Sequence, residues 1–123
     1  MKLQYKRYYD KYNRLIREIL DTEETIIKYD DRNNIIYKKN WNIKSGEIWY
    51  EYYQSFDDHN RMIYFKDTEN GQEFSVKYNS NVYIEEKQFS NGEYIKYIYD
   101  EENNVILEIS NEDTIEFINI YED

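Results

Sequence analysis

Residues 57–64 read DDHNRMIY, and similar stretches occur at residues 30–37 (DDRNNIIY) and 100–107 (DEENNVIL). A degenerate copy begins near Asn79, which gives spacings of 27, 22 and 21 residues between successive copies. Each copy joins a short polar turn to a run rich in Ile, Val and Tyr. Repeats of this length suit one two-stranded β-hairpin each. The repeat therefore predicts a sheet built from about four hairpins.

The chain beyond residue 22 supports the same structure, because its apolar residues alternate with polar ones. Asn70-Gly71 and Asn91-Gly92 supply the positive φ angles that tight hairpin turns require. No helical pattern separates the apolar runs, so we expect neighbouring strands to pair antiparallel in sequence order. The expected strands are residues 25–29, 34–39, 47–53, 61–67, 72–79, 82–89, 93–99, 105–110 and 114–121.

The first 21 residues show a different pattern. Their apolar residues recur every three or four positions, which is typical of one side of an α-helix. Lys and Arg occupy the other side, and neither Gly nor Pro interrupts the segment. We therefore expect an amphipathic helix over about residues 3–21, whose apolar stripe packs on the sheet. The stripe consists of Tyr5, Tyr8, Tyr9, Tyr12, Leu15, Ile16, Ile19 and Leu20.

The expected fold is α+β, in a single domain that comprises residues 1–123. Residues 1–21 form the N-terminal helix, and residues 22–123 form an antiparallel β-meander of eight or nine short strands. Alternation predicts one buried sheet face, which carries residues such as Phe74, Val76 and Tyr78. The chain contains 16 Tyr, so we expect tyrosine rings to do much of the packing.

A resemblance to a known family adds to this expectation. The stretch FDDHNRMIYFKD at residues 56–67, followed by Asn70-Gly71 and Tyr78-Asn79, resembles the YD repeat of Rhs and teneurin proteins. The resemblance covers about residues 29–121 and implies β-hairpins joined into one continuous antiparallel sheet. In long arrays of that family the sheet curls into a shell around a toxin or another cargo.

Some details agree with the family and others depart from it. Tyr29-Asp30 and Tyr99-Asp100 match the dipeptide that names the repeat. The family has a Gly after the acidic turn, where this chain has Asn33, Asn60 and Asn103. About four copies are too few to enclose a cargo, so the cage function does not carry over. The resemblance implies no catalytic residue.

The charge of the chain is unevenly distributed. The net charge is -10, yet residues 1–20 carry +4, and no Lys or Arg follows Lys96. Nine carboxylates lie between Asp100 and Asp123. Such a surface repels nucleic acid and anionic membranes, so we expect neither as a direct partner and favour a basic protein.

The composition also limits the chemistry and the location of the protein. There is no cysteine, which excludes disulfides, thiolate zinc sites and cysteine nucleophiles. No apolar run reaches the length of a membrane span, and no leader-like segment follows Met1. We therefore expect a cytoplasmic protein.

His59 is the only histidine and lies beside Asp57 and Asp58, as the start of an acid–base site would. The equivalent positions of other copies hold Arg32 and Glu102, so the repeat does not require imidazole there. The acids of the turns also offer oxygen ligands to Ca²⁺, although such acids commonly cap their own backbone. We expect no catalytic residue, no metal, no cofactor and no enzyme.

The first functional hypothesis is a non-catalytic, protein-binding inhibitor. A small acidic domain can occupy the basic nucleic-acid-binding surface of a nuclease, with carboxylates in place of phosphates. In size and charge the chain is similar to anti-CRISPR proteins of phages, which implies a CRISPR-associated or other nuclease as the partner. The proposed contact residues are Tyr99, Asp100, Glu101, Glu102, Glu108, Glu112, Asp113, Glu116, Phe117 and Tyr121.

Two other functions stay open. In the first, the chain is a short relative of Rhs proteins with an immunity or structural role, which neutralises a toxin or pairs its sheet edge with a larger array. A carbohydrate-binding module uses exposed aromatic rings instead. Homodimerisation through an uncovered face or edge of the sheet is also an alternative. The densest aromatic patch consists of Trp41, Trp49, Tyr50, Tyr52 and Tyr53.

Overall fold

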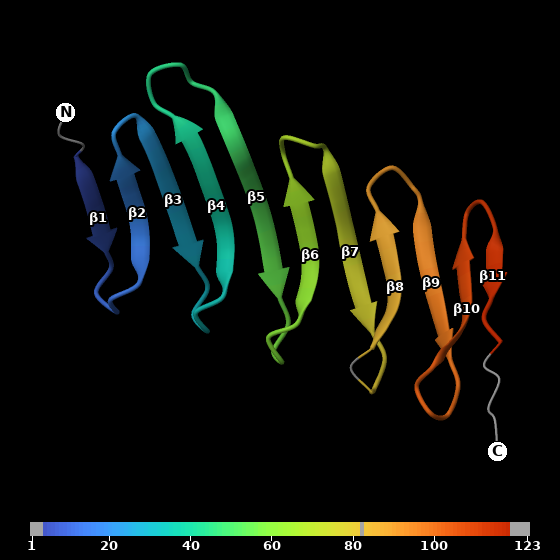
Figure 1. Ribbon diagram of the computed structural model, residues 1–123. Coiled ribbons are helices and arrows are strands. Elements are labelled where there is room, and N and C mark those ends of the chain that lie inside the picture. The colour runs from blue at the N-terminus through green and yellow to red at the C-terminus, as the bar shows by residue number, and fades with distance from the viewer. Residues whose placement is uncertain (1–3, 82, 119–123) are drawn as a thin grey trace. The chain divides into compact units, whose positions relative to one another are not determined.

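The structure, a computed structural model, describes residues 4–81 and 83–118. In these residues the chain forms eleven β-strands and no helix, so the fold class is all-β (Figure 1). The strands follow one another in chain order as an antiparallel meander. They are β1 (Tyr5–Tyr9), β2 (Leu15–Leu20), β3 (Glu23–Tyr29), β4 (Ile35–Asn42), β5 (Ile48–Phe56), β6 (Met62–Asp67), β7 (Gln72–Tyr78), β8 (Ile84–Phe89), β9 (Tyr94–Tyr99), β10 (Val105–Ser110) and β11 (Thr114–Glu116).

The predicted N-terminal helix, and with it the α+β class, is wrong. Residues 5–20 form the hairpin β1–β2, in which Lys6 pairs with Ile19 and Tyr8 with Arg17. The turn between the two strands begins at Asp10 and is a further copy of the repeated motif. The strands β1 (YKRYY) and β2 (LIREIL) do not alternate strictly, and Tyr12 lies in the turn between them, so apolar residues recur every three or four positions. The antiparallel meander expected for the rest of the chain is present, and β11 is shorter than predicted within the described residues.

The repeated turns share one geometry. In each of four copies an Asn adopts a positive φ, which Asn tolerates better than most residues. The ladder shifts by one residue beside each of these turns, as in hairpins that combine a type I turn with a bulge. The four residues are Asn13, Asn33, Asn60 and Asn103, with φ between 62° and 69°.

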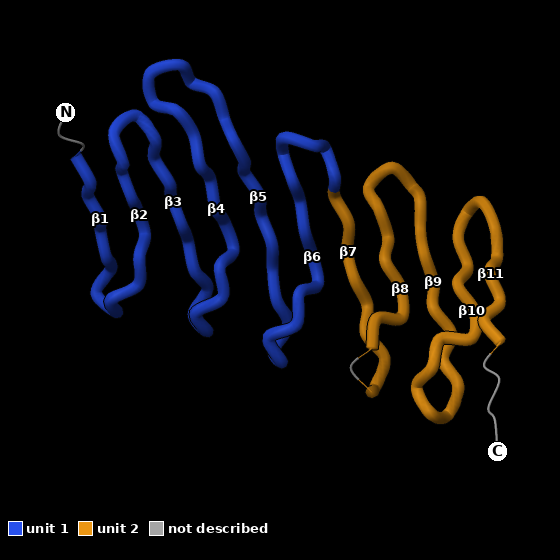
Figure 2. Tube along the Cα trace, in the orientation of Figure 1, with its two compact units in different colours: residues 1–72 blue, residues 73–123 orange. Residues whose placement is uncertain are grey.

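The chain divides into two compact units, residues 1–72 and 73–123 (Figure 2). The first unit contains β1 to β6. Directly paired residues of an antiparallel ladder lie on the same face of the sheet. Glu24 pairs with Trp41 and Lys28 with Tyr37, and these residues define what we call the first face of this unit. Its second face carries the intervening residues, such as Thr25 and Asn40.

The second unit contains β7 to β11. On one of its faces Phe74 pairs with Phe89, and their ring centroids are 5.5 Å apart. Val76 lies on the same face and is only 5% exposed. The other face carries the ion pair between Lys77 and Glu86, whose charged atoms are 3.9 Å apart.

Neither unit has a conventional core. Among the described residues no helix or second sheet covers the strands, and only Ile27, Val76 and Glu24 are less than 9% exposed. Stability therefore depends on pairs across neighbouring strands, in which the charged groups of Lys and Arg lie over aromatic rings. Arg17 over Tyr8 and Lys28 over Tyr37 are two such contacts. The expectation of one buried face does not hold, because both faces mix charged and aromatic side chains.

Candidate functional site

The described residues contain no group of three or more His, Asp or Glu side chains that could hold a metal ion. In the same part of the chain, no helix is long and apolar enough to cross a membrane. The features that remain are the row of turns at the strand ends and the two faces of the sheet.

The acidic residue at the start of each turn holds the turn together. Asp57 Oδ1 accepts hydrogen bonds from the backbone N–H groups of His59 and Arg61, at 2.9 and 3.0 Å, and Oδ2 accepts one from Arg61 Nε at 2.8 Å. Burial alone would raise the pKa of this carboxyl group, but these hydrogen bonds outweigh it and lower the pKa below its usual value. His59 contributes through its backbone, and its side chain is exposed.

Side chains also connect each turn to the next within a unit. Arg14 Nη1 donates to the backbone oxygen of Asp30 at 3.2 Å and to Asn33 Oδ1 at 2.9 Å. Asn34 Nδ2 donates to Asn60 Oδ1 at 3.0 Å. In the second unit Asn81 Nδ2 donates to Asn103 Oδ1 at 3.1 Å. The turn residues are therefore occupied in structural contacts with one another.

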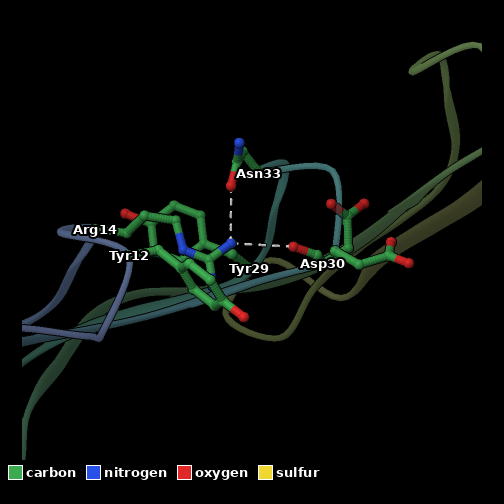
Figure 3. Close-up of a pocket in the computed structure, with 6 residues that line it drawn as sticks. Tyr12, Arg14, Tyr29, Asp30 and Asn33 are labelled. Carbon is green, nitrogen blue, oxygen red and sulfur yellow. Dashed lines mark hydrogen bonds between the residues drawn. The ribbon is translucent and has the colours of Figure 1, made fainter.

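A recess of about 820 Å³ lies between the first two turns (Figure 3). The guanidinium of Arg14 lies between two aromatic rings, 5.2 Å from the ring centre of Tyr12 and 4.8 Å from that of Tyr29. Its Nε also pairs with Asp10 at 2.8 Å. Arg14 is therefore held in place by these contacts and by its hydrogen bonds to the second turn.

The first face of the first unit carries a buried carboxylate. Glu24 is 5% exposed and accepts hydrogen bonds from Arg17 Nε at 2.6 Å and from Trp41 Nε1 at 3.2 Å. The ammonium group of Lys39 lies 3.4 Å from the ring centre of Trp41. We call Arg17, Glu24, Lys39 and Trp41 the Glu24 cluster. Sequence reasoning missed it, because only the register of β2, β3 and β4 brings its members together.

A second polar contact follows on the same face. Tyr37 Oη donates to Glu51 Oε2 at 2.5 Å, and Thr68 Oγ1 donates to Glu51 Oε1 at 2.9 Å. The hydrogen bond from Tyr37 lowers the pKa of Glu51. Burial and the nearby carboxylate together raise the pKa of Tyr37 well above its usual value. The arrangement favours the neutral phenol and the ionised acid.

The predicted aromatic patch is divided between the two faces. Tyr53 pairs with Tyr37 on the first face, where Trp41 also lies. Tyr50 and Tyr52 lie on the second face, and Tyr52 continues the row towards Phe65, with centroid distances of 6.2 and 6.0 Å. Trp49 is 53% exposed. The patch does not present one continuous aromatic surface to a sugar.

The predicted acidic contact residues are also separated. The turn that begins at Asp100 and the turn that contains Glu112 and Asp113 lie at opposite ends of β10, which has six residues (Figure 1). Asp100 accepts hydrogen bonds from the backbone of Asn104 and Glu102, and these bonds lower its pKa despite some burial.

The remaining members of the predicted contact set differ in their environment. Tyr99 Oη donates to the backbone oxygen of Ile84 at 2.5 Å, and its ring packs on Tyr83. Glu101, Glu102, Glu116 and Phe117 are exposed, and Glu108 is half-buried in β10. Tyr121 lies outside the described residues. The structure therefore places these residues in separate groups.

Comparisons with known proteins bear on the fold. No protein-family model and no curated protein matches the sequence. Among solved structures, the chain is similar to a chain of the Tc holotoxin pore of Photorhabdus luminescens, with a TM-score of 0.68 and 13% sequence identity. The match covers 88% of this chain and 7% of the toxin chain. At this identity the likeness shows the fold alone, and it is compatible with the resemblance to YD repeats.

Proposed function

We propose that the chain is a non-catalytic sheet module of the YD-repeat type, which presents its open faces to a protein partner. In this role it is a structural or immunity component related to Rhs systems, and it requires no cofactor. The similarity to a segment of the Tc holotoxin pore chain supports the architecture. The repeated turns and the all-antiparallel meander support the same assignment.

The observation that carries the proposal is the exposure of both sheet faces. Large aromatic side chains such as Trp49, Tyr50 and Tyr53 are 53%, 36% and 43% exposed. Tyr and Trp combine an apolar ring with a polar group, which suits them to a surface that binds another protein. Aromatic residues are also enriched in protein interfaces. A sheet with this surface is suited to bind another protein rather than to enclose a small substrate.

Site-specific photo-cross-linking in the native host tests this proposal. A benzophenone amino acid replaces Trp49 on the sheet or, as a control, Asp58, whose side chain is fully exposed in a turn. We expect a discrete protein adduct from the Trp49 position and little or none from the Asp58 position. Adducts that form equally at both positions, or only at Asp58, would contradict the proposal, because random collision favours the more exposed site.

The inhibitor and carbohydrate-binding functions stay predictions, as do a basic partner and a cytoplasmic location. The comparisons offer no support for the anti-CRISPR likeness. Charge mimicry requires an affinity for the partner that falls strongly with salt, whereas binding through an aromatic sheet face changes little. Measuring the affinity of the cross-linked partner between about 0.01 M and 1 M salt separates the two.

A further inference from the structure

We propose that the two outer strands of the chain are complementary docking edges: β1 of one copy pairs with β11 of a second copy. The partner is therefore this same chain, bound head to tail by β-sheet extension. The inference goes beyond the proposed function, since it concerns strand edges and not the sheet faces.

The first observation is that both strands have backbone groups to offer. Among the described residues, β1 pairs with β2 alone and β11 with β10 alone. The backbone N–H of Asp21 donates to the backbone oxygen of Gln4 at 3.1 Å. Since hydrogen-bonded residues alternate along an antiparallel ladder, this bond shows which residues of β1 face β2. The N–H and C=O groups of Tyr5 and Arg7 point away from β2.

The same reasoning applies to β11. The backbone N–H of Phe117 donates to the oxygen of Ile106 at 2.9 Å, and Leu107 pairs with Glu116. The N–H and C=O groups of Thr114 and Glu116 therefore point away from β10. An antiparallel pairing of the two edges can join these outward-facing groups to those of β1.

The second observation is the charge of the two edges. Strand β1 carries Lys6 and Arg7 and no acid, and all five of its residues are exposed; Arg7 Nε also pairs with Glu18 of β2 at 3.1 Å. The β11 edge carries Glu116 and follows Glu112 and Asp113, all exposed. Opposite charges on directly paired strands are stabilising, and like charges are destabilising. Pairing β1 with β1, or β11 with β11, brings like charges together, so the head-to-tail combination is favoured.

One register satisfies both observations. If Arg7 lies opposite Glu116 of the second copy, the guanidinium and the carboxylate face each other across outward-facing backbone groups. The same register places Tyr8 opposite Ile115, which are 40% and 43% exposed in the single chain. Apolar area is then buried together with the ion pair. Because the contact is heterologous, further copies can add in the same way, and the assembly grows with concentration.

Sedimentation equilibrium of the full chain tests this inference. We expect the average mass to rise above 15.4 kDa with increasing concentration at low salt, and to fall back in about 1 M salt. Arg7→Glu or Glu116→Arg alone should weaken the association by about tenfold or more. An equimolar mixture of the two variants should restore it, since opposite charges face each other again at every junction.

Matched variants distinguish the effect of charge on the edge strands from the effect of charge elsewhere on the surface. Lys44→Glu and Glu101→Arg change exposed turn residues by the same charge and should leave the association unaltered. Thr114→Pro removes one outward-facing donor at the start of an edge strand, where Pro is tolerated, and should also weaken the association. Circular dichroism spectra that match the wild type confirm that each variant is folded.

Two results overturn the inference. One is a mass that stays at that of a single chain at all concentrations. The other is an association that Arg7→Glu, Glu116→Arg and Thr114→Pro all leave unchanged. Neither result affects the cross-linking at Trp49, so the failure of this inference is distinguishable from the failure of the proposed function.

Discussion

The guanidinium of Arg17 lies 2.6 Å from the carboxylate of Glu24, and Glu24 is only 5% exposed although the sheet has one layer. The side chains of Arg17 and Trp41 therefore do what a covering helix does elsewhere. They exclude water from a charged group and supply its hydrogen bonds.

Removing this carboxylate tests that role. Glu24→Ala leaves the Trp41 N–H and the Arg17 guanidinium without their acceptor, and we expect it to lower the free energy of unfolding by about 2–3 kcal/mol. Glu24→Gln keeps a hydrogen-bond acceptor for the indole of Trp41 and should lower the free energy of unfolding by about 1 kcal/mol. Urea denaturation followed by circular dichroism measures both. Glu23→Ala, at an exposed neighbouring position, is the control. An equal loss of unfolding free energy in Glu23→Ala would contradict the stabilising role of the Glu24 cluster.

The turn carboxylates predict a specific pH dependence. The pKa of Asp57 is lower in the folded chain than in the unfolded one, so its stabilisation is present above about pH 4 and is lost as the pH falls through the folded value. The difference in Tm between the wild type and Asp57→Asn should thus be largest at neutral pH and shrink in acid. Thermal melts across this range check it.

The same carboxylate allows a comparison of two substitutions. Asn79 accepts the equivalent backbone hydrogen bonds in its own turn at 3.0 and 3.1 Å, so an amide can maintain this turn. Asp57→Ala should therefore lower the Tm more than Asp57→Asn. Asp58→Asn, in an exposed position of the same turn, provides the control. A pH-independent loss of equal size in all three would refute the role given to Asp57.

The positive φ of Asn13, 63°, is the basis of a third prediction. Asn13→Ala places a Cβ with no compensating polar group in the left-handed region and should cost about 1–2 kcal/mol. Asn13→Gly should change the stability by a few tenths of a kcal/mol at most, because Gly adopts this conformation freely. Chemical denaturation of both, with Lys11→Ala as the control, decides whether conformation or side-chain contacts select Asn here.

Tyr37 provides a test in alkaline solution. Burial and the hydrogen bond to Glu51 raise the pKa of Tyr37 in the folded chain. The neutral phenol therefore stabilises the fold below about pH 10, and this stabilisation is lost as the pH rises through the pKa of Tyr37 in the folded chain. Tyr37→Phe should lower the free energy of unfolding by about 1 kcal/mol at neutral pH. In strong base the free energies of unfolding of the variant and of the wild type should become equal. Guanidinium unfolding at several pH values measures this. Tyr50→Phe, on the opposite face, is the control.

Period-two alternation located the strands from residue 23 onwards, because it depends on local chemistry alone. The same logic failed at residues 5–20. There the turn at Asp10 contains Tyr12, and its ring extended the apolar spacing into a helical pattern. The signal that would have corrected it was present, since Tyr9-Asp10 and Asn13 repeat the arrangement of Tyr29-Asp30 and Asn33.

The sites were harder to predict than the strands. Glu24 and Trp41 are 17 residues apart in the chain and meet only because β3 and β4 pair in one register. Alternation also implied that one face is buried, whereas the charged groups of Lys38 and Lys39 lie over rings on opposite faces. A single sequence shows which residues alternate but not whether another layer covers them.

Because each hairpin within the described ranges pairs only with its immediate neighbours in the strand order, the construction is modular. Duplication or loss of one hairpin leaves the alternation of the faces and the spacing of the turns intact elsewhere. Such a chain can change its length in evolution by whole hairpins while each strand keeps its environment.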